Sequence, residues 1–65
     1  MNRKEIKNEI AALTTMEEDY AYFGSAIYVV KTGENQFSVC DNGEEVDGLD
    51  LDNAVRIVVE NLEEI

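Results

Sequence analysis

The sequence predicts a single α+β domain in which helices pack on one face of a small antiparallel sheet. Apolar residues recur at helical spacing near both ends of the chain, whereas the middle holds two segments rich in β-branched and aromatic residues. Turn-forming residues separate and follow these two segments. The chain has 65 residues, which is enough for one domain, residues 1–65. A domain of this size buries only about 60% of the surface that its unfolded chain exposes.

An N-terminal helix is expected from about Arg3 to Leu13. Asn2 and Glu5 have the spacing of the N-cap and N3 residues in a capping box. Apolar residues then follow every three or four positions as far as Leu13, which is the period of a helix with one buried face.

Residues 14–23 are expected to extend this helical region. Met16, Tyr20 and Phe23 keep the helical period. The segment forms either a second short helix or a kinked continuation of the first. Gly24 is the expected stop, because glycine adopts the left-handed conformation without a Cβ penalty.

A β-hairpin is expected in the middle of the chain, with strands at residues 25–31 and 36–41. If Gly33-Glu34 forms a two-residue turn, glycine at its first position fits the type II′ form. This turn pairs Val30 with Phe37. One face of the hairpin then carries Tyr28, Val30, Phe37 and Val39, and the other carries Ile27, Val29, Ser38 and Cys40.

The second of these faces is a candidate homodimer surface. It exposes Ile27, Val29 and Cys40, which makes it too apolar for an ordinary solvated face. A three-residue turn would shift this pairing by one residue.

A final helix is expected after the hairpin. Asn42-Gly43 is a strong turn signal, and residues 44–49 form either a third strand or a loop. Asp50 is a suitable N-cap for a helix from Leu51 to about Leu62. The apolar face of this helix comprises Leu51, Ala54, Val55, Val58, Leu62 and Ile65. We therefore expect a hairpin or a three-stranded meander, with the C-terminal helix packed on one sheet face.

The chain is strongly acidic, with a formal net charge of −10 at pH 7. From Asn8 onward, fourteen acidic side chains accompany only two basic ones, Lys31 and Arg56. Ordinary soluble surfaces mix both signs of charge. The imbalance is the best clue to function in this sequence, and a generically solvated surface is the alternative explanation for it.

Several functional classes are disfavoured by composition. The chain has no histidine and one cysteine, Cys40, so it lacks the groups that activate a nucleophile or hold a transition metal. Residues 41–52 have the length of a calcium loop, but Val46 stands where an EF-hand needs glycine. We expect no enzyme activity, no cofactor and no metal site.

Charge and hydropathy also restrict the partners. A surface this acidic repels a phosphate backbone, so direct binding to nucleic acid is not expected. No apolar run approaches the roughly 18 residues that cross a bilayer. We therefore expect a cytoplasmic protein without a membrane partner.

The acidic residues themselves are candidates for binding a basic partner. The candidates before the expected hairpin are Glu17, Glu18 and Asp19. The candidates from the end of its second strand onward are Asp41, Glu44, Glu45, Asp47, Asp50 and Asp52. Positions two to four residues apart on a strand or helix set carboxylates roughly 5 to 7 Å apart. Duplex DNA carries one charge about every 3.4 Å along each strand. Such carboxylates can therefore take the place of phosphates in a DNA-binding groove.

In size, acidity and helix–hairpin–helix layout, the chain resembles the small phage-encoded inhibitors that imitate nucleic acid. Among these it is most similar in kind to the anti-CRISPR proteins that occupy the target-DNA channel of an effector complex. The resemblance covers the whole chain and rests on the acidic residues named above, since no sequence motif defines that class. It implies a stoichiometric inhibitor in the host cytosol, whose partner is a basic DNA-binding protein such as a CRISPR effector or a restriction enzyme.

A protein-interaction module is the alternative function. This module could be an immunity protein or antitoxin that neutralises a basic toxin, or a small dimeric adaptor that uses the Ile27, Val29 and Cys40 face. A DNA mimic should bind with an affinity that falls steeply with salt, whereas a hydrophobic adaptor should be insensitive to it.

Overall fold

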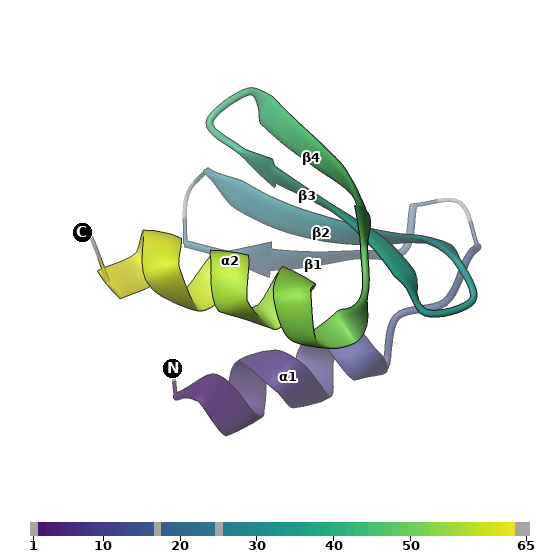
Figure 1. Ribbon diagram of the computed structural model, residues 1–65, viewed down its shortest axis with the longest axis horizontal. Coiled ribbons are helices and arrows are strands. Elements are labelled where there is room, and N and C mark those ends of the chain that lie inside the picture. The colour runs from purple at the N-terminus through teal and green to yellow at the C-terminus, as the bar shows by residue number, and fades with distance from the viewer. Residues whose placement is uncertain (1, 17, 25, 64–65) are drawn as a thin grey trace.

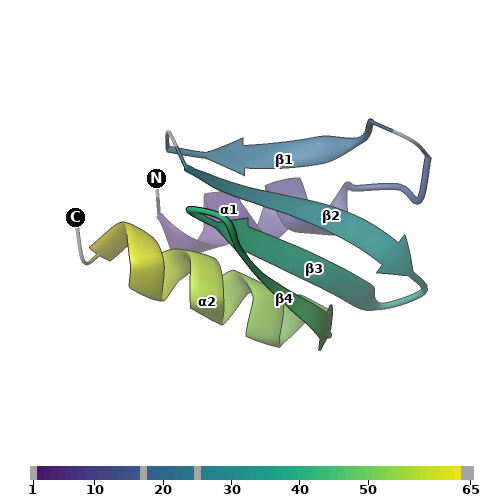
Figure 2. The same ribbon diagram turned by 90° about the horizontal axis from the view of Figure 1, so that it is seen from above.

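The computed structural model describes residues 2–16, 18–24 and 26–63, which form two helices and one four-stranded antiparallel sheet. The elements in chain order are α1 (Arg3–Ala11), β1 (Tyr20–Phe23), β2 (Ile27–Gly33), β3 (Gln36–Asp41), β4 (Glu44–Leu49) and α2 (Leu51–Glu63). The strands lie side by side in the order β1-β2-β3-β4. Both helices lie below the sheet in Figure 1, and Figure 2 shows the strands in front of the helices. The fold is therefore α+β, with two layers and one sheet face left open.

Helix α1 begins as its sequence predicts. The Glu5 backbone N–H donates a 2.9 Å hydrogen bond to Asn2 Oδ1, which is the N-cap interaction. The helix ends at Ala11, two residues earlier than expected, and the Leu13 N–H still bonds to the Ile10 carbonyl. Leu13 lies beyond the end of the helix but is still buried, so its side chain contributes to the core.

The expectation of helix for residues 14–23 is wrong, because 14–16, 18 and 19 form a non-helical connection and the remaining described residues form a strand. Tyr20–Phe23 is strand β1, which pairs antiparallel with β2 through Ala21 opposite Val29 and Phe23 opposite Ile27. Along β1 burial alternates, with the tyrosines exposed and the residues after them buried. The apolar residues of this segment fit both a helical and a strand period. Pairing with the neighbouring strand β2 selects the strand. Gly24, with φ +69°, ends a strand rather than a helix.

The predicted register of the β2–β3 hairpin is also wrong, by one residue. Gly33 pairs with Gln36, so the turn is Glu34-Asn35, and Asn35 has φ +50°. The register shifts between Lys31 and Gly33, and Lys31 then lies opposite Phe37. Because successive side chains point to opposite faces, this slip regroups the residues of the hairpin. Ile27 and Val29 now share the core face with Phe37 and Val39, and Tyr28 shares the open face with Cys40.

This regrouping removes the homodimer surface expected from the sequence. Ile27 and Val29 are 3% and 0% exposed, and both lie in the core beneath the helices. Cys40 is partly exposed on the opposite face, where it pairs with Tyr28. The three residues therefore do not share a surface.

The third expected strand is present as β4, and α2 begins where predicted. Asn42 and Gly43, with φ of +52° and +90°, form the tight turn between β3 and β4. The Asn53 N–H donates a 2.8 Å hydrogen bond to Asp50 Oδ1, so Asp50 caps α2. The Leu51 N–H bonds to Asn35 Oδ1 at 3.3 Å and joins the start of α2 to the β2–β3 turn.

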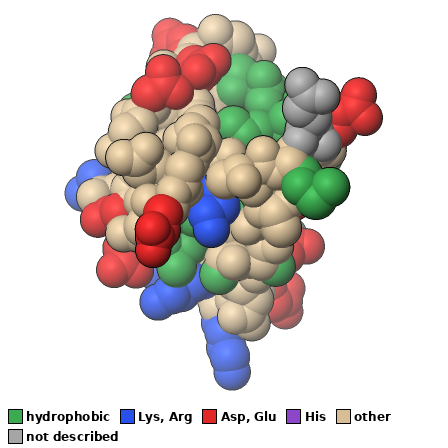
Figure 3. Space-filling view, turned by 90° about the vertical axis from the view of Figure 1, so that its right-hand side faces the viewer, with side chains coloured by type: hydrophobic (Ala, Val, Ile, Leu, Met, Phe, Trp, Pro, Cys, Tyr) green, Lys and Arg blue, Asp and Glu red, His purple; other side chains and the backbone are tan. Residues whose placement is uncertain are grey.

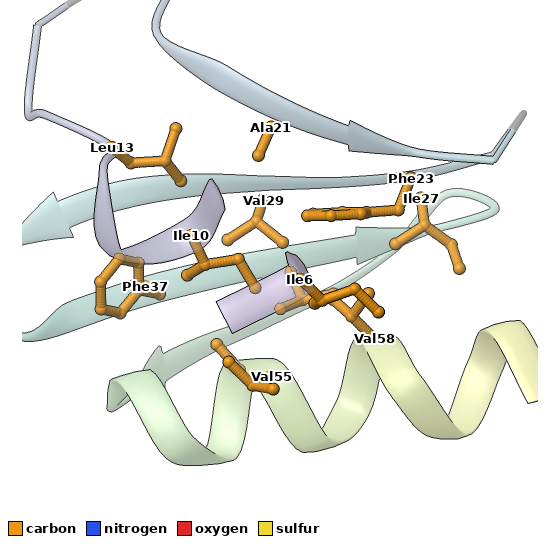
Figure 4. Close-up of a cluster of buried hydrophobic side chains, with 12 residues drawn as sticks. Ile6, Ile10, Leu13, Ala21, Phe23, Ile27, Val29, Phe37, Val55 and Val58 are labelled. Atoms are coloured by element: carbon orange, nitrogen blue, oxygen red, sulfur yellow. The ribbon is translucent and has the colours of Figure 1, made fainter. Parts of the chain in front are cut away.

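One hydrophobic core lies between the sheet and the helices. Figure 4 shows side chains from both helices and the sheet pointing into this shared interior. The buried members are Ile6, Ile10, Leu13, Ala21, Phe23, Ile27, Val29, Phe37, Val39, Ala54, Val55 and Val58. Leu51, Ile57, Val59 and Leu62 pack against them at the edge. Ile65, expected on the same helix face, lies outside the described residues.

Candidate functional site

The predicted acidic residues occupy separate places in the fold. Glu18 and Asp19 precede β1, and Glu17 lies outside the described residues. Asp41, Glu44, Glu45 and Asp47 belong to the β3–β4 hairpin, whereas Asp50 and Asp52 lie at the start of α2. The tip of that hairpin and the start of α2 lie at opposite ends of the sheet (Figure 1). Figure 3 views the end of the molecule where α2 starts, and the acidic side chains on this side are scattered among side chains of other types. The acids therefore do not converge on one face.

Three of the predicted acids have local structural partners. Asp19 Oδ2 accepts hydrogen bonds from the Thr14 backbone N–H and from Thr14 Oγ1, both at 2.7 Å, and these bonds lower the pKa of Asp19 below its usual value of 3.8. Asp50 caps α2. Asp52 Oδ1 lies 3.6 Å from Lys7 Nζ and joins the two helices by an exposed ion pair. These three carboxylates therefore have a structural role within the fold.

Asp41, Glu44, Glu45 and Asp47, which we call the acidic hairpin, form a different group. The register sets Asp41 directly opposite Glu44, and Glu45 opposite Cys40. Directly opposed side chains have Cβ atoms about 4.5–5.5 Å apart, and like charges in that position are destabilising. Within the described residues, no lysine or arginine nitrogen lies within 4.0 Å of these four carboxylates. Consecutive pairs point to opposite faces of the sheet, so Glu45 lies on the open face and the Asp41–Glu44 pair on the other. The acidic hairpin is therefore an unneutralised negative charge that is displayed on both faces of one sheet edge.

Strand β4, which carries three of these acids, is an edge strand of the sheet. Two of its residues, Asp47 and Gly48, oppose Ser38, so β4 bulges there, and Gly48 adopts φ +72°. Charges and bulges on an edge strand prevent a second sheet from pairing with it. Protection of the edge explains why β4 is charged, but it does not require that all the charges have one sign.

The open face of the sheet carries an aromatic cluster of Tyr20, Tyr22 and Tyr28, which we call the tyrosine cluster. The three ring centroids lie 5.7–6.0 Å apart, and Tyr20 packs edge-on against both other rings. Tyr22 is 67% exposed and Tyr20 is 43% exposed. The sequence offered two signals for this cluster, the alternation of Tyr20 with Tyr22 and the position of Tyr28 two residues before Val30. The first signal depends on recognising residues 20–23 as a strand, and the second depends on the register of β2 and β3.

The tyrosine cluster and the acidic hairpin are linked across the sheet. Tyr22 pairs with Tyr28, Tyr28 with Cys40, and Cys40 with Glu45, so one row of side chains crosses all four strands. The neighbouring Cys40 side chain is the main cause that raises the pKa of Tyr28 from its usual value of 10.0, and the charge of Glu45 raises it further. The open face is therefore aromatic at β1 and acidic at β4.

Neither a metal centre nor a membrane span is found in the described part of the chain. Its Cys, Asp and Glu side chains form no group of three or more that could hold a metal ion. Neither α1 nor α2 has the length and apolar character needed to cross a bilayer.

Comparison with protein-family models, with curated proteins and with solved structures finds no match to this chain.

Proposed function

We propose that this protein is a stoichiometric inhibitor that imitates the phosphate charge of DNA. Its carboxylates occupy the nucleic-acid-binding groove of a basic host defence protein, such as a CRISPR effector complex, and exclude the DNA. The observation that carries the proposal is the pairing of Asp41 with Glu44 beside two further acids, without a cation in the described residues to neutralise them.

The spacing of the acidic hairpin suits this role. Glu45 and Asp47 are two positions apart on one strand, which corresponds to roughly 7 Å, and the opposed Asp41 and Glu44 lie closer together. A phosphate backbone presents a line of charge of similar density. Lysine and arginine side chains that contact phosphates can therefore contact these carboxylates, and binding relieves the repulsion within the hairpin.

Only some of the acidic residues are available as the main contact for the basic partner. Asp50 and Asp52 lie at the end of the sheet opposite the hairpin tip, and they have roles in capping α2 and in joining it to α1. We therefore assign the primary contact to the acidic hairpin, with Glu18 and Asp19 as a separate negative patch near β1.

The second candidate function is a protein-interaction module that neutralises a basic toxin or serves as an adaptor. The exposed tyrosine cluster favours it, because tyrosine is enriched in the cores of protein interfaces. The two candidates differ in the partner. A DNA mimic shares its binding site with DNA, whereas an antitoxin need not.

The proposal is tested by affinity capture from the lysate of a bacterial host, with this protein as bait. We expect to recover a DNA-binding protein or complex that high salt releases and that duplex DNA displaces. A bait in which Glu44, Glu45 and Asp47 are replaced by lysine should recover none of it. Recovery of a partner that resists salt and tolerates bound DNA would contradict the proposal and favour the interaction module.

A further inference from the structure

The open face of the sheet has an unusual composition for a solvated surface. Three tyrosine rings lie on adjacent strands β1 and β2, and the partly buried Val30 and Cys40 lie beside them. Tyr20 and Tyr22, the two rings on β1, together expose a large aromatic area to solvent. Aromatic side chains contribute strongly to interface energies because they bury a large area with few rotatable bonds.

The borders of this face are acidic. Glu45 and Asp47 lie along β4, and Glu18 and Asp19 precede β1 on the opposite side. A shallow depression at the β1 border brings acidic and aromatic groups together. It is lined by Met16, Glu18, Asp19, Tyr20, Val30 and Lys31. Lys31 Nζ lies over the Phe37 ring, 5.9 Å from its centroid. The other polar or aromatic side chains that line the depression are those of Glu18, Asp19 and Tyr20.

This charge determines what can cover the face. A second copy of the chain would bring another charge of −10 and the same acidic borders against the first. The stacked bases of a single-stranded nucleic acid would suit the rings, but the phosphates that accompany them would meet carboxylates on both sides. A cationic protein surface is the occupant that matches both the rings and their borders.

We propose that the tyrosine cluster binds arginine side chains on the basic protein partner, with the guanidinium groups stacked on the rings and paired with the bordering carboxylates. The inference rests on the proposed function in one respect, since it takes the partner to be basic. Arginine suits this surface better than lysine because its planar guanidinium stacks on aromatic faces and pairs with carboxylates through two parallel hydrogen bonds. The cluster thus gives the protein a preference for arginine that phosphate imitation by itself does not provide.

The experiment uses the full chain with two probes, a short poly-arginine peptide and a poly-lysine peptide of equal length. Their affinities are measured by isothermal titration calorimetry at physiological salt. Tyr22→Ile removes one ring but keeps a residue suited to an exposed strand, and Tyr22→Phe retains the ring as the matched control. Circular dichroism verifies that each variant is folded.

We expect the arginine peptide to bind the wild-type protein about 2- to 5-fold more tightly than the lysine peptide. Tyr22→Ile should abolish this preference, while Tyr22→Phe should retain it. Equal affinities for the two peptides in the wild-type protein, or a preference that Tyr22→Ile leaves unchanged, would overturn the inference. Sedimentation velocity supplies a second criterion, because a wild-type dimer that Tyr22→Ile dissociates would show that a second copy covers the face and would also overturn it.

The same measurements separate this inference from DNA imitation. If neutral replacements in the acidic hairpin weaken both peptides equally and Tyr22→Ile has no effect, the charge role stands and the tyrosine role fails. If Tyr22→Ile abolishes the arginine preference but lysate capture recovers no DNA-binding protein, the tyrosine role stands and the proposed function fails.

Discussion

Asp41 and Glu44 lie directly opposite each other across the β3–β4 hairpin, so the fold places two carboxylates where a sheet ordinarily places compatible side chains. The repulsion between them has a cost in stability, and no described lysine or arginine within ion-pair distance offsets it. We interpret this arrangement as a binding surface that becomes favourable when a cationic partner covers it.

The first prediction concerns this pair. Glu44→Lys should stabilise the folded protein by roughly 0.5–1 kcal/mol, because it converts a repulsive cross-strand pair into an attractive one. Denaturant unfolding followed by circular dichroism measures the change. The control is Glu34→Lys, which makes the same charge change in the β2–β3 turn. Equal stabilisation by the two variants would show that only net charge matters.

The second prediction concerns Asp19 and pH. Its pKa is lowered by the hydrogen bonds from Thr14, so its contribution to stability is present above its usual pKa of 3.8 and is lost as pH falls through the lowered value. Asp19→Asn should therefore reduce the melting temperature at neutral pH by a few degrees. The difference from wild type should vanish in strong acid. A difference that persists unchanged in strong acid would contradict this role of the Asp19 carboxylate.

The third prediction concerns Tyr28 at alkaline pH. The neighbouring Cys40 side chain is the chief cause that raises its pKa from the usual value of 10.0. Folding is therefore favoured below that usual value and loses this contribution as pH rises through the raised pKa. The difference between ultraviolet absorbance titrations of the wild type and Tyr28→Phe isolates the ionisation of Tyr28, which should occur above about pH 10. Cys40→Ala should lower the pKa of Tyr28, and an unchanged Tyr28 titration in that variant would contradict the assignment.

The fourth prediction tests the register of β2. Val29 is fully buried, whereas Val30 is partly exposed on the open face. Val29→Thr places a hydroxyl group in the core and should destabilise the protein by about 1–3 kcal/mol. Val30→Thr makes the same chemical change and should cost less than about 0.5 kcal/mol. The reverse order would support the register predicted from the Gly33-Glu34 turn.

The features of this chain that local interactions determine can be predicted from its sequence. The N-caps Asn2 and Asp50 and the turn at Asn42-Gly43 were predicted correctly, because local hydrogen bonds and backbone sterics determine them. The α+β class followed from the same local signals.

The errors arose where tertiary pairing decides the outcome. Residues 20–23 fit a helical period and a strand period equally well, and only the neighbouring β2 selects the strand. In the β2–β3 hairpin, an extra residue between Lys31 and Gly33 determines which side chains of β2 share the buried face with Phe37. The sequence does not predict the tyrosine cluster for both reasons, since it places Tyr20 in a helical segment and Tyr28 on the face of Phe37.

For the candidate site, the sequence identified the acids but could not tell their roles apart. Asp19, Asp50 and Asp52 have partners that are close only in the folded chain or at a helix terminus. The opposition of Asp41 and Glu44 depends on the presence of β4, which the sequence left open between a strand and a loop.

The central claim is that the acidic hairpin replaces DNA phosphates in a basic groove. The most direct test is the salt dependence of the affinity for the captured partner, measured for three proteins. These are the wild type, a hairpin variant with Glu44→Gln, Glu45→Gln and Asp47→Asn, and a control with Glu9→Gln, Glu34→Gln and Glu60→Gln, which removes the same charge at exposed positions elsewhere.

We predict that affinity falls steeply with salt in the wild type and the control, and that the hairpin variant binds weakly with a much shallower dependence. Duplex DNA should compete with both strong binders. Equal salt dependence in the hairpin variant and the wild type, together with simultaneous binding of DNA, would contradict the account.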